Sequence, residues 1–178
     1  MAADPPRAPD GPARGRRVPG TRRLARELAL RLLFQRDLEG GPPEVTAETF
    51  EAAFSPENDP ENALALTARD FQRAWPLARE LFFGVAAVQA GLDDGIGRAA
   101  VNWTLARMSP VDRGLIRLAY YEMLHRGDIP ARVSLNEALE IAKSYGDDDS
   151  VAFINGVLDR LLREAAVQGG EAAHGPDL

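Results

Sequence analysis

The sequence predicts an all-α fold, and two kinds of signal support this prediction. Apolar residues recur three and four positions apart over several stretches of the chain, as they do on one face of a helix. Residues typical of helix ends delimit the same stretches: Ser109 followed by Pro110 marks one start, and Gly146 marks one end. A chain of 178 residues suits a single domain that buries most of one core.

The amino-terminal residues 1–20 form an arm rich in arginine and proline. They include five prolines and three glycines and cannot assemble an apolar face, so we expect disorder. No apolar segment resembling a signal peptide occurs there, and no run of the chain approaches membrane-spanning length. The chain has no cysteines, which excludes disulfides, a thiol nucleophile and cysteine metal sites. We therefore expect a cytoplasmic protein.

Three helices are expected in the first half of the domain, which spans residues 21–165. The first begins with Thr21 as its N-cap and runs to about residue 38. The second covers about residues 46–54, and an acidic, turn-rich loop follows from 55 to about 63. The third covers roughly residues 67–90, with Pro76 either kinking it or marking its true start. Three glycines between residues 91 and 97 then fray the helix or separate two helices.

The helix that begins after Ser109 is predicted to be central, because it is apolar on most sides as far as about residue 125. Glu122 is its odd member, and we expect it to pair with an arginine. The next helix is predicted to begin at a capping box formed by Ser134 and Glu137 and to end at Gly146.

The last helix is predicted to use Asp148 or Asp149 as its cap. Gly156 interrupts its apolar stripe and predicts close approach of another backbone or a ligand. Periodicity is lost after Arg163, so residues 166–178 are expected to form a flexible tail.

Charge is distributed unevenly along the chain. Residues 1–36 carry a local charge of +6, whereas the whole chain carries −6, which leaves −12 for the remainder. Arg22, Arg23 and Arg26 lie in the opening turns of the first helix, where the helix dipole disfavours positive charge. An anionic partner explains this placement; a solvated arginine face is the alternative, and the residues alone favour neither.

The carboxyl-terminal region carries a family resemblance. Its sequence reads IPARVSLNEALEIAKSYGDDDSVAFINGVLDRL, with an Asn-Glu-Ala helix start, an Ala-Lys-aromatic-Gly end, an Asp-Ser pair and the run Phe-Ile-Asn-Gly-Val-Leu-Asp. This pattern resembles the NusB family of transcription antitermination factors, and the stretch RRLARELALRLLFQRD resembles the family's opening. The resemblance covers about residues 22–38 and 77–163. It implies about seven helices in two packed helical bundles.

The resemblance also implies a function. NusB proteins bind the single-stranded boxA element of nascent RNA together with NusE, a small-subunit ribosomal protein, in complexes with RNA polymerase and other Nus factors. They promote processive transcription of rRNA operons. The family's arginine-rich opening belongs to its RNA-binding surface, which adds weight to the anionic partner.

The candidate RNA-binding residues combine positive charge for phosphates with aromatic faces for unstacked bases. Tyr145 and Phe153 are expected near one corner between two helices, where simple packing is the alternative. The resemblance adds Asp149, whose carboxylate could accept hydrogen bonds from base amino groups. The full set is Arg22, Arg23, Arg26, Arg132, Tyr145, Asp149 and Phe153.

The resemblance also assigns a partner contact to Asp112 and its neighbour Arg113, facing NusE. Ala131 and Ala152 stand where some relatives carry an aromatic and a basic residue, which weakens direct RNA contact. The arm at residues 1–20 is expected to compensate with salt-sensitive affinity that does not depend on sequence.

The sequence is also compatible with other functions. One is a protein-interaction module that self-associates, as a homodimer for example, without specific RNA binding. Another is an accessory RNA-binding domain in rRNA processing; the chain leaves no room for a methyl-transfer domain after the matching region. An enzyme is the weakest alternative, because no nucleophile, base and orienting group assemble from the sequence. Neither His125 nor His174 has a nearby His or Cys to complete a metal site, so we expect no metal and no cofactor.

Overall fold

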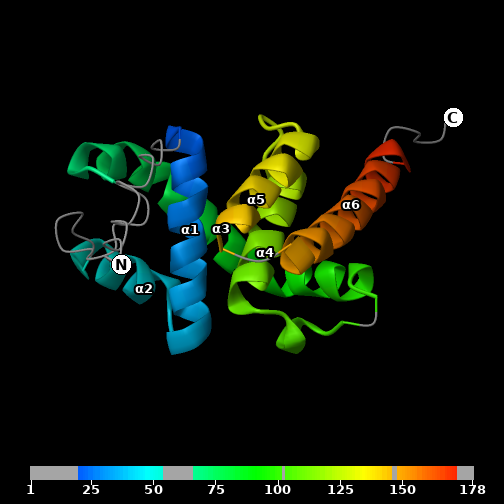
Figure 1. Ribbon diagram of the computed structural model, residues 1–178, viewed down its shortest axis with the longest axis horizontal. Coiled ribbons are helices and arrows are strands. Elements are labelled where there is room, and N and C mark those ends of the chain that lie inside the picture. The colour runs from blue at the N-terminus through cyan, green and yellow to red at the C-terminus, as the bar shows by residue number, and fades with distance from the viewer. Residues whose placement is uncertain (1–19, 54–65, 102, 146–147, 172–178) are drawn as a thin grey trace, which may run out of the picture.

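The computed structural model describes residues 20–53, 66–101, 103–145 and 148–171, with side chains as far as residue 165. The expected acidic loop and most of the amino-terminal arm lie outside these ranges. Within them the chain forms six α-helices and one 3₁₀ helix, against about seven helices expected (Figure 1). These are α1 (Thr21–Glu39), α2 (Pro43–Ala53), α3 (Ala68–Ala99), η1 (Leu105–Arg107), α4 (Pro110–His125), α5 (Ala131–Tyr145) and α6 (Asp148–Glu171). None of these helices is long and apolar enough to cross a membrane.

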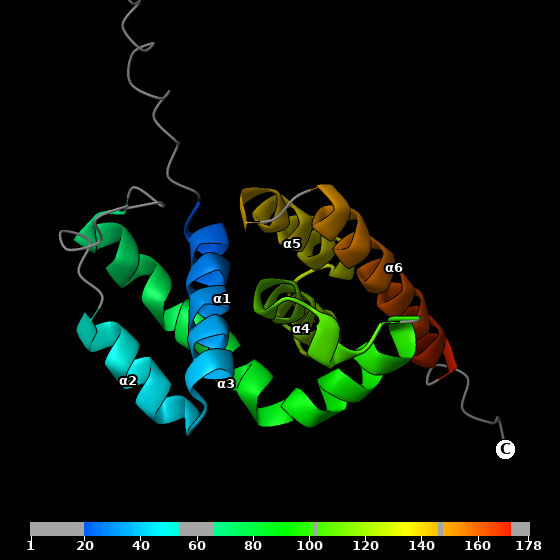
Figure 2. The same ribbon diagram turned by 60° about the horizontal axis from the view of Figure 1, so that its bottom comes forward.

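The helices pack in two groups that share α3. Helices α1 and α2 pack against each other and against α3, while α4, α5 and α6 pack together beside the other part of α3 (Figure 2). Helix α1 also contacts α4, which joins the two groups. The core is continuous across both groups, and its largest fully buried side chains include Leu24, Leu28, Phe82, Ile96, Leu115, Ile116, Ile141 and Ile154.

Helix α3 is longer than its sequence predicts. It begins after Thr67, which forms a capping box with Asp70. The backbone departs from helical geometry at Val88 rather than at Pro76, and the helix continues through the three glycines between residues 91 and 97. Gly95 is needed there, because a Cβ at this position would lie 2.7 Å from the ring of Tyr120. The glycine lets α3 pack closely against α4.

The prediction for α4 is confirmed. Ser109 is the N-cap, its hydroxyl accepts a hydrogen bond from the Asp112 N–H at 3.0 Å, and Pro110 occupies the first turn. The helix is buried along most of its length. Glu122 pairs with Arg26 in the core, as expected for a buried carboxylate.

Two predicted helix starts are wrong. Gly20 precedes α1 and no side chain caps the helix, so Thr21 is its first residue rather than its N-cap. Helix α5 begins at Ala131, because the Pro130 carbonyl already accepts the first helical hydrogen bonds. Ser134 and Glu137 therefore lie inside the helix and form no capping box. The Ser134 hydroxyl is buried and finds no hydrogen-bond partner within the described ranges.

Helix α6 also differs from its prediction. It begins at Asp148, so Asp148 and Asp149 both lie in its first turn, and the preceding residue lies outside the described ranges. The helix continues to Glu171, well past the point where periodicity is lost. Gly156 is exposed, and no described atom lies within 4 Å of a Cβ built on it, so no backbone of the described residues approaches it closely. Close approach of a ligand stays a prediction.

Candidate nucleic-acid interface

Two hollows lie near opposite ends of α5, a helix whose 15 residues span roughly 20 Å. Helices α1 and α5 begin at one end of the molecule, and α5 ends beside the starts of α4 and α6 (Figure 1). The hollow at this second end has a volume of about 540 Å³ and is called the aromatic pocket. It is lined by Trp103, Arg107, Met108, Ser109, Asp112, Tyr145, Asp149, Ser150 and Phe153.

The aromatic pocket brings together the three residues predicted at the corner between α5 and α6. Tyr145 at the end of α5 and Phe153 in α6 line it together with Asp149. Tyr145 remains 38% exposed, whereas Phe153 is half-buried and packs on the core. The two aromatic side chains therefore do not close the corner by packing it shut.

Two further lining residues were missed by sequence reasoning. The indole of Trp103 is 42% exposed, and its ring centroid lies 5.9 Å from that of Phe153. The Arg107 guanidinium lies over the Trp103 ring, 4.7 Å from its centroid. A tryptophan and an arginine four residues apart, just before the strong helix start at Ser109, were the signal that could have identified this pair.

The two carboxylates of the aromatic pocket differ in their surroundings. Asp112 accepts a hydrogen bond from the Ser150 hydroxyl at 2.5 Å, which fastens α4 to α6. Asp149 is exposed, and among the described residues its carboxylate makes no hydrogen bond or ion pair. Its oxygens remain available to donors on a ligand.

The hollow at the other end of α5 lies between the start of α1 and the segment that leads into α5, and is called the arginine pocket. Its volume is about 720 Å³. It is lined by Gly20, Thr21, Arg22, Arg23, Arg26, Asp128, Ile129, Pro130, Val133 and Glu137. The arginines at the start of α1 therefore line a pocket, and the carboxylates of Asp128 and Glu137 line the same pocket.

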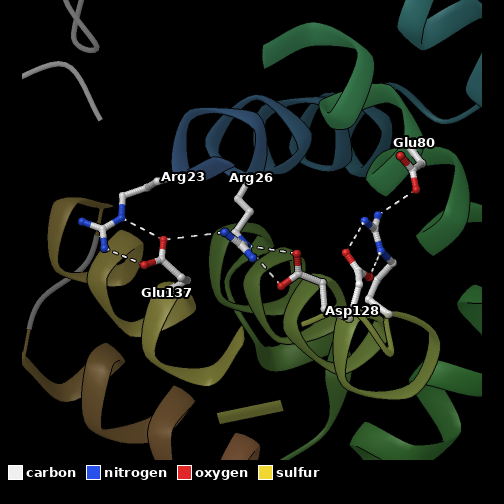
Figure 3. A network of polar contacts seen from close by, with 7 residues as sticks. Arg23, Arg26, Glu80, Asp128 and Glu137 are labelled. Atoms are coloured by element: carbon white, nitrogen blue, oxygen red, sulfur yellow. Dashed lines mark hydrogen bonds and ion pairs between the residues drawn. The ribbon is translucent and has the colours of Figure 1, made fainter. Parts of the chain in front are cut away.

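Two of these arginines are held by ion pairs. Arg23 donates to both carboxylate oxygens of Glu137, at 2.8 and 2.9 Å (Figure 3). Arg26 donates to both oxygens of Glu122, at 3.0 and 3.1 Å, and its side chain is only 6% exposed. Arg26 also lies 3.7 Å from Glu137, which connects the two pairs. The hydrogen bond from Arg23 holds the pKa of the Glu137 carboxyl below its ordinary value.

Arg22 and Arg132 are placed differently. Both are exposed, and neither forms an ion pair with another residue that the structure describes. Arg126 lies near this end of the molecule and pairs with Asp128 and Glu80 (Figure 3). Of the four predicted phosphate contacts, Arg22 and Arg132 are therefore the ones that can meet a phosphate without breaking an existing pair.

Arg113, predicted to face a partner, is turned inward. Its Nε donates to Asp37 of α1 at 2.9 Å, and its Nη1 donates to the carbonyl of Leu105 in η1 at 2.9 Å. Arg117 completes the cluster by pairing with Asp37 and Asp93. Arg113 braces α1, η1 and α4 together, and of the two predicted partner residues Asp112 alone borders the aromatic pocket.

The NusB family model matches residues 23–163 of the chain. The chain belongs to the NusB family. Among its relatives, the transcription antitermination protein NusB of Citrifermentans bemidjiense is 39% identical over 79% of this chain and 93% of its own. The transcription antitermination protein NusB of Bacillus pumilus is 41% identical over 83% of this chain and 98% of its own.

Solved structures share the fold. NusB of T. maritima superposes with a TM-score of 0.64 at 33% identity, over 84% of this chain and 96% of that one. A structure of antitermination factors NusB and NusE in complex with dsRNA superposes with a TM-score of 0.63 at 23% identity, over 81% of this chain and 97% of that one.

Family membership makes this protein a transcription antitermination factor and not an enzyme. Within the part of the chain that the structure describes, no group of His, Asp and Glu residues is arranged to hold a metal ion.

Proposed function

We propose that this NusB protein binds the single-stranded boxA element of nascent RNA together with NusE, in the cytoplasm, and so promotes processive transcription of rRNA operons with RNA polymerase and other Nus factors. The observation that carries the proposal is the aromatic pocket. Tyr145, Asp149 and Phe153, chosen from the sequence as RNA contacts, line one hollow, which offers aromatic faces and an exposed carboxylate to an unstacked base.

Charge at the other end of α5 supports the same function. The exposed guanidinium groups of Arg22 and Arg132 supply phosphate contacts near the arginine pocket, and the arm at residues 1–20 adds four further arginines. Arg23 and Arg26 were also predicted to contact RNA, but their ion pairs support a different proposal: we assign them to holding α1 against α5 and α4, through Glu137 and Glu122. An RNA strand that runs along α5 would contact Arg22 and Arg132 near the start of the helix and the aromatic pocket near its end.

The decisive experiment measures RNA binding by fluorescence anisotropy at fixed salt. Labelled boxA RNA, a scrambled single strand of the same composition and a duplex of the boxA sequence are titrated with the protein, first alone and then with NusE. The proposal expects preference for single-stranded boxA that strengthens with NusE. Equal affinity for all three RNAs, unchanged by NusE, would contradict it and favour a protein-interaction module.

The contribution of the arm is measured separately. Deletion of residues 1–20 should flatten the dependence of log affinity on log salt, because each phosphate contact to a single strand contributes a slope of about 0.7. The preference for boxA over the scrambled strand should persist. An unchanged salt slope would show that the arm takes no part in binding.

NusE is expected to bind near Asp112, the predicted partner residue that lies at the surface. Asp112→Asn keeps an acceptor for the Ser150 hydroxyl and removes the negative charge. It should weaken binding to NusE, measured by titration of the protein with labelled NusE in the absence of RNA. Unchanged NusE affinity would move the partner contact elsewhere.

A further inference from the structure

Trp103 and Arg107 form a structural unit that the proposed RNA contacts do not include. They belong to the segment between α3 and α4, far in sequence from Tyr145, Asp149 and Phe153. The fold nevertheless places all five in one hollow. Trp103 is among the large apolar side chains that remain exposed, although the structure buries most of the others in its core.

Two side chains contact the Trp103 ring, and 42% of the residue nevertheless remains exposed to solvent. Arg107 covers the ring at 4.7 Å from its centroid, and Phe153 meets it at an interplanar angle of 52°. The guanidinium and the Phe153 ring thus fix the orientation of the indole from two sides. An oriented indole with a large exposed area is a platform for a planar group.

The surroundings of the platform select the planar group. Asp149 supplies exposed carboxylate oxygens, which accept hydrogen bonds from amino groups and repel phosphates. Arg107 supplies the positive charge that a nucleotide phosphate needs. Tyr145 offers a second exposed aromatic ring in the same hollow, whose volume of about 540 Å³ is typical of a small-molecule pocket. A nucleobase with an exocyclic amino group satisfies each of these features.

We propose that Trp103 is an RNA-binding residue of this protein, on which one unstacked, amino-bearing base of single-stranded RNA stacks, and that Arg107 is its positioning residue. This inference rests on the proposed function and extends it by naming the group that occupies the aromatic pocket. Any base can stack its face on the Trp103 ring, so stacking alone does not select among bases. The carboxylate of Asp149 favours bases that carry an amino group on their edge, because it accepts a hydrogen bond from that group.

Fluorescence of Trp103 reports the stacking directly. The chain has two tryptophans, and the other, Trp75, is buried between Phe50 and Phe71. Trp75→Phe makes Trp103 the sole tryptophan. It breaks no hydrogen bond within the described ranges, because the Trp75 indole N–H has no partner there. A base that stacks on Trp103 quenches its emission, so the quenching should saturate at the same RNA concentration as the anisotropy.

Substitutions test the energetic contribution. Trp103→Ala should weaken boxA binding by about tenfold, since one base–aromatic stack is lost, and Trp103→Phe should recover part of the loss. Val101→Ala is the matched control, because Val101 is exposed nearby but does not line the pocket. Thermal unfolding followed by circular dichroism is compared for all three variants, so that loss of fold is separated from loss of binding.

Besides orienting the Trp103 ring, Arg107 is proposed to contact a phosphate, and this contact has its own readout. Arg107→Ala should weaken binding and lower the salt slope by about 0.7, because one phosphate contact is removed. Arg69→Ala removes an exposed arginine that lies in the first turn of α3, outside both hollows, and should leave the preference for boxA unchanged.

The outcomes separate this inference from the proposed function. If boxA is preferred but Trp103 emission does not change, or Trp103→Ala binds as tightly as the unmodified protein, the base-stacking inference is overturned and the proposed function stands. If boxA is not preferred even with NusE, the proposed function fails; quenching by any single strand would then still support stacking, and its absence would refute it. A change in emission caused by NusE without RNA would assign the pocket to a protein contact instead.

Discussion

The buried ion pair between Arg26 and Glu122 allows a test of whether Arg26, which the sequence predicts to bind RNA, contacts RNA or only stabilises the fold. Arg26→Met keeps most of the side-chain length and removes the charge. Glu122 is 1% exposed and accepts two hydrogen bonds from Arg26, so the variant leaves a buried carboxylate without its principal partner. Breaking such a pair typically costs about 3–5 kcal/mol of folding free energy. For a chain of this size the corresponding fall in Tm is roughly 6–20 °C.

The double variant Arg26→Met with Glu122→Leu supplies the control. Both charges are then absent, and apolar side chains of similar volume fill the space between α1 and α4, so most of the lost stability should return. Urea and thermal denaturation followed by circular dichroism measure the free energy of unfolding of each variant. Anisotropy with boxA RNA is measured on the same samples below their melting transitions.

The two roles of Arg26 predict different results for the double variant. If Arg26 acts only by holding α1 in place, the double variant binds boxA within about twofold of the unmodified protein. Full stability combined with a tenfold loss of RNA affinity would refute the structural role and return Arg26 to the RNA contacts. A cost below about 1 kcal/mol for Arg26→Met would show that the pair is not effectively buried.

Further predictions concern stability. Gly156→Ala should raise the free energy of unfolding by about 0.5–1 kcal/mol, because the position is helical and a Cβ there meets open space. Gly95→Ala should lower the free energy of unfolding by about 1–3 kcal/mol, because its Cβ would clash with the Tyr120 ring. Equal effects of the two substitutions in urea denaturation would contradict this reasoning. The lowered pKa of Glu137 means that its pairing with Arg23 stabilises the fold above the ordinary glutamate value of 4.5 and that this contribution is lost as pH falls below it. Glu137→Gln should therefore flatten the stability profile in that acidic range, and an unchanged profile in urea denaturation at graded pH would refute the assignment.

Local signals in the sequence determined several elements correctly. The start of α4 depends on Ser109 and Pro110, and the start of α3 on Thr67 and Asp70, which are within three residues of each other. Interactions of this range are fixed by sequence spacing alone. The same reasoning failed at Ser134 and Glu137, although their spacing matches a capping box. Helix α5 already begins before them, because the N–H groups of Val133 and Ser134 donate to the Pro130 carbonyl.

The sequence by itself determined the helical class, the family and the three residues Tyr145, Asp149 and Phe153 that line the aromatic pocket. Tertiary structure alone decided which charges are available, because Arg26 and Glu122 are 96 residues apart, and Arg23 and Glu137 are 114 residues apart. It also brought Trp103 and Arg107 to the pocket. Apolar periodicity records which face of a helix is buried, whereas the partner of a buried charge depends on which helices the fold packs together.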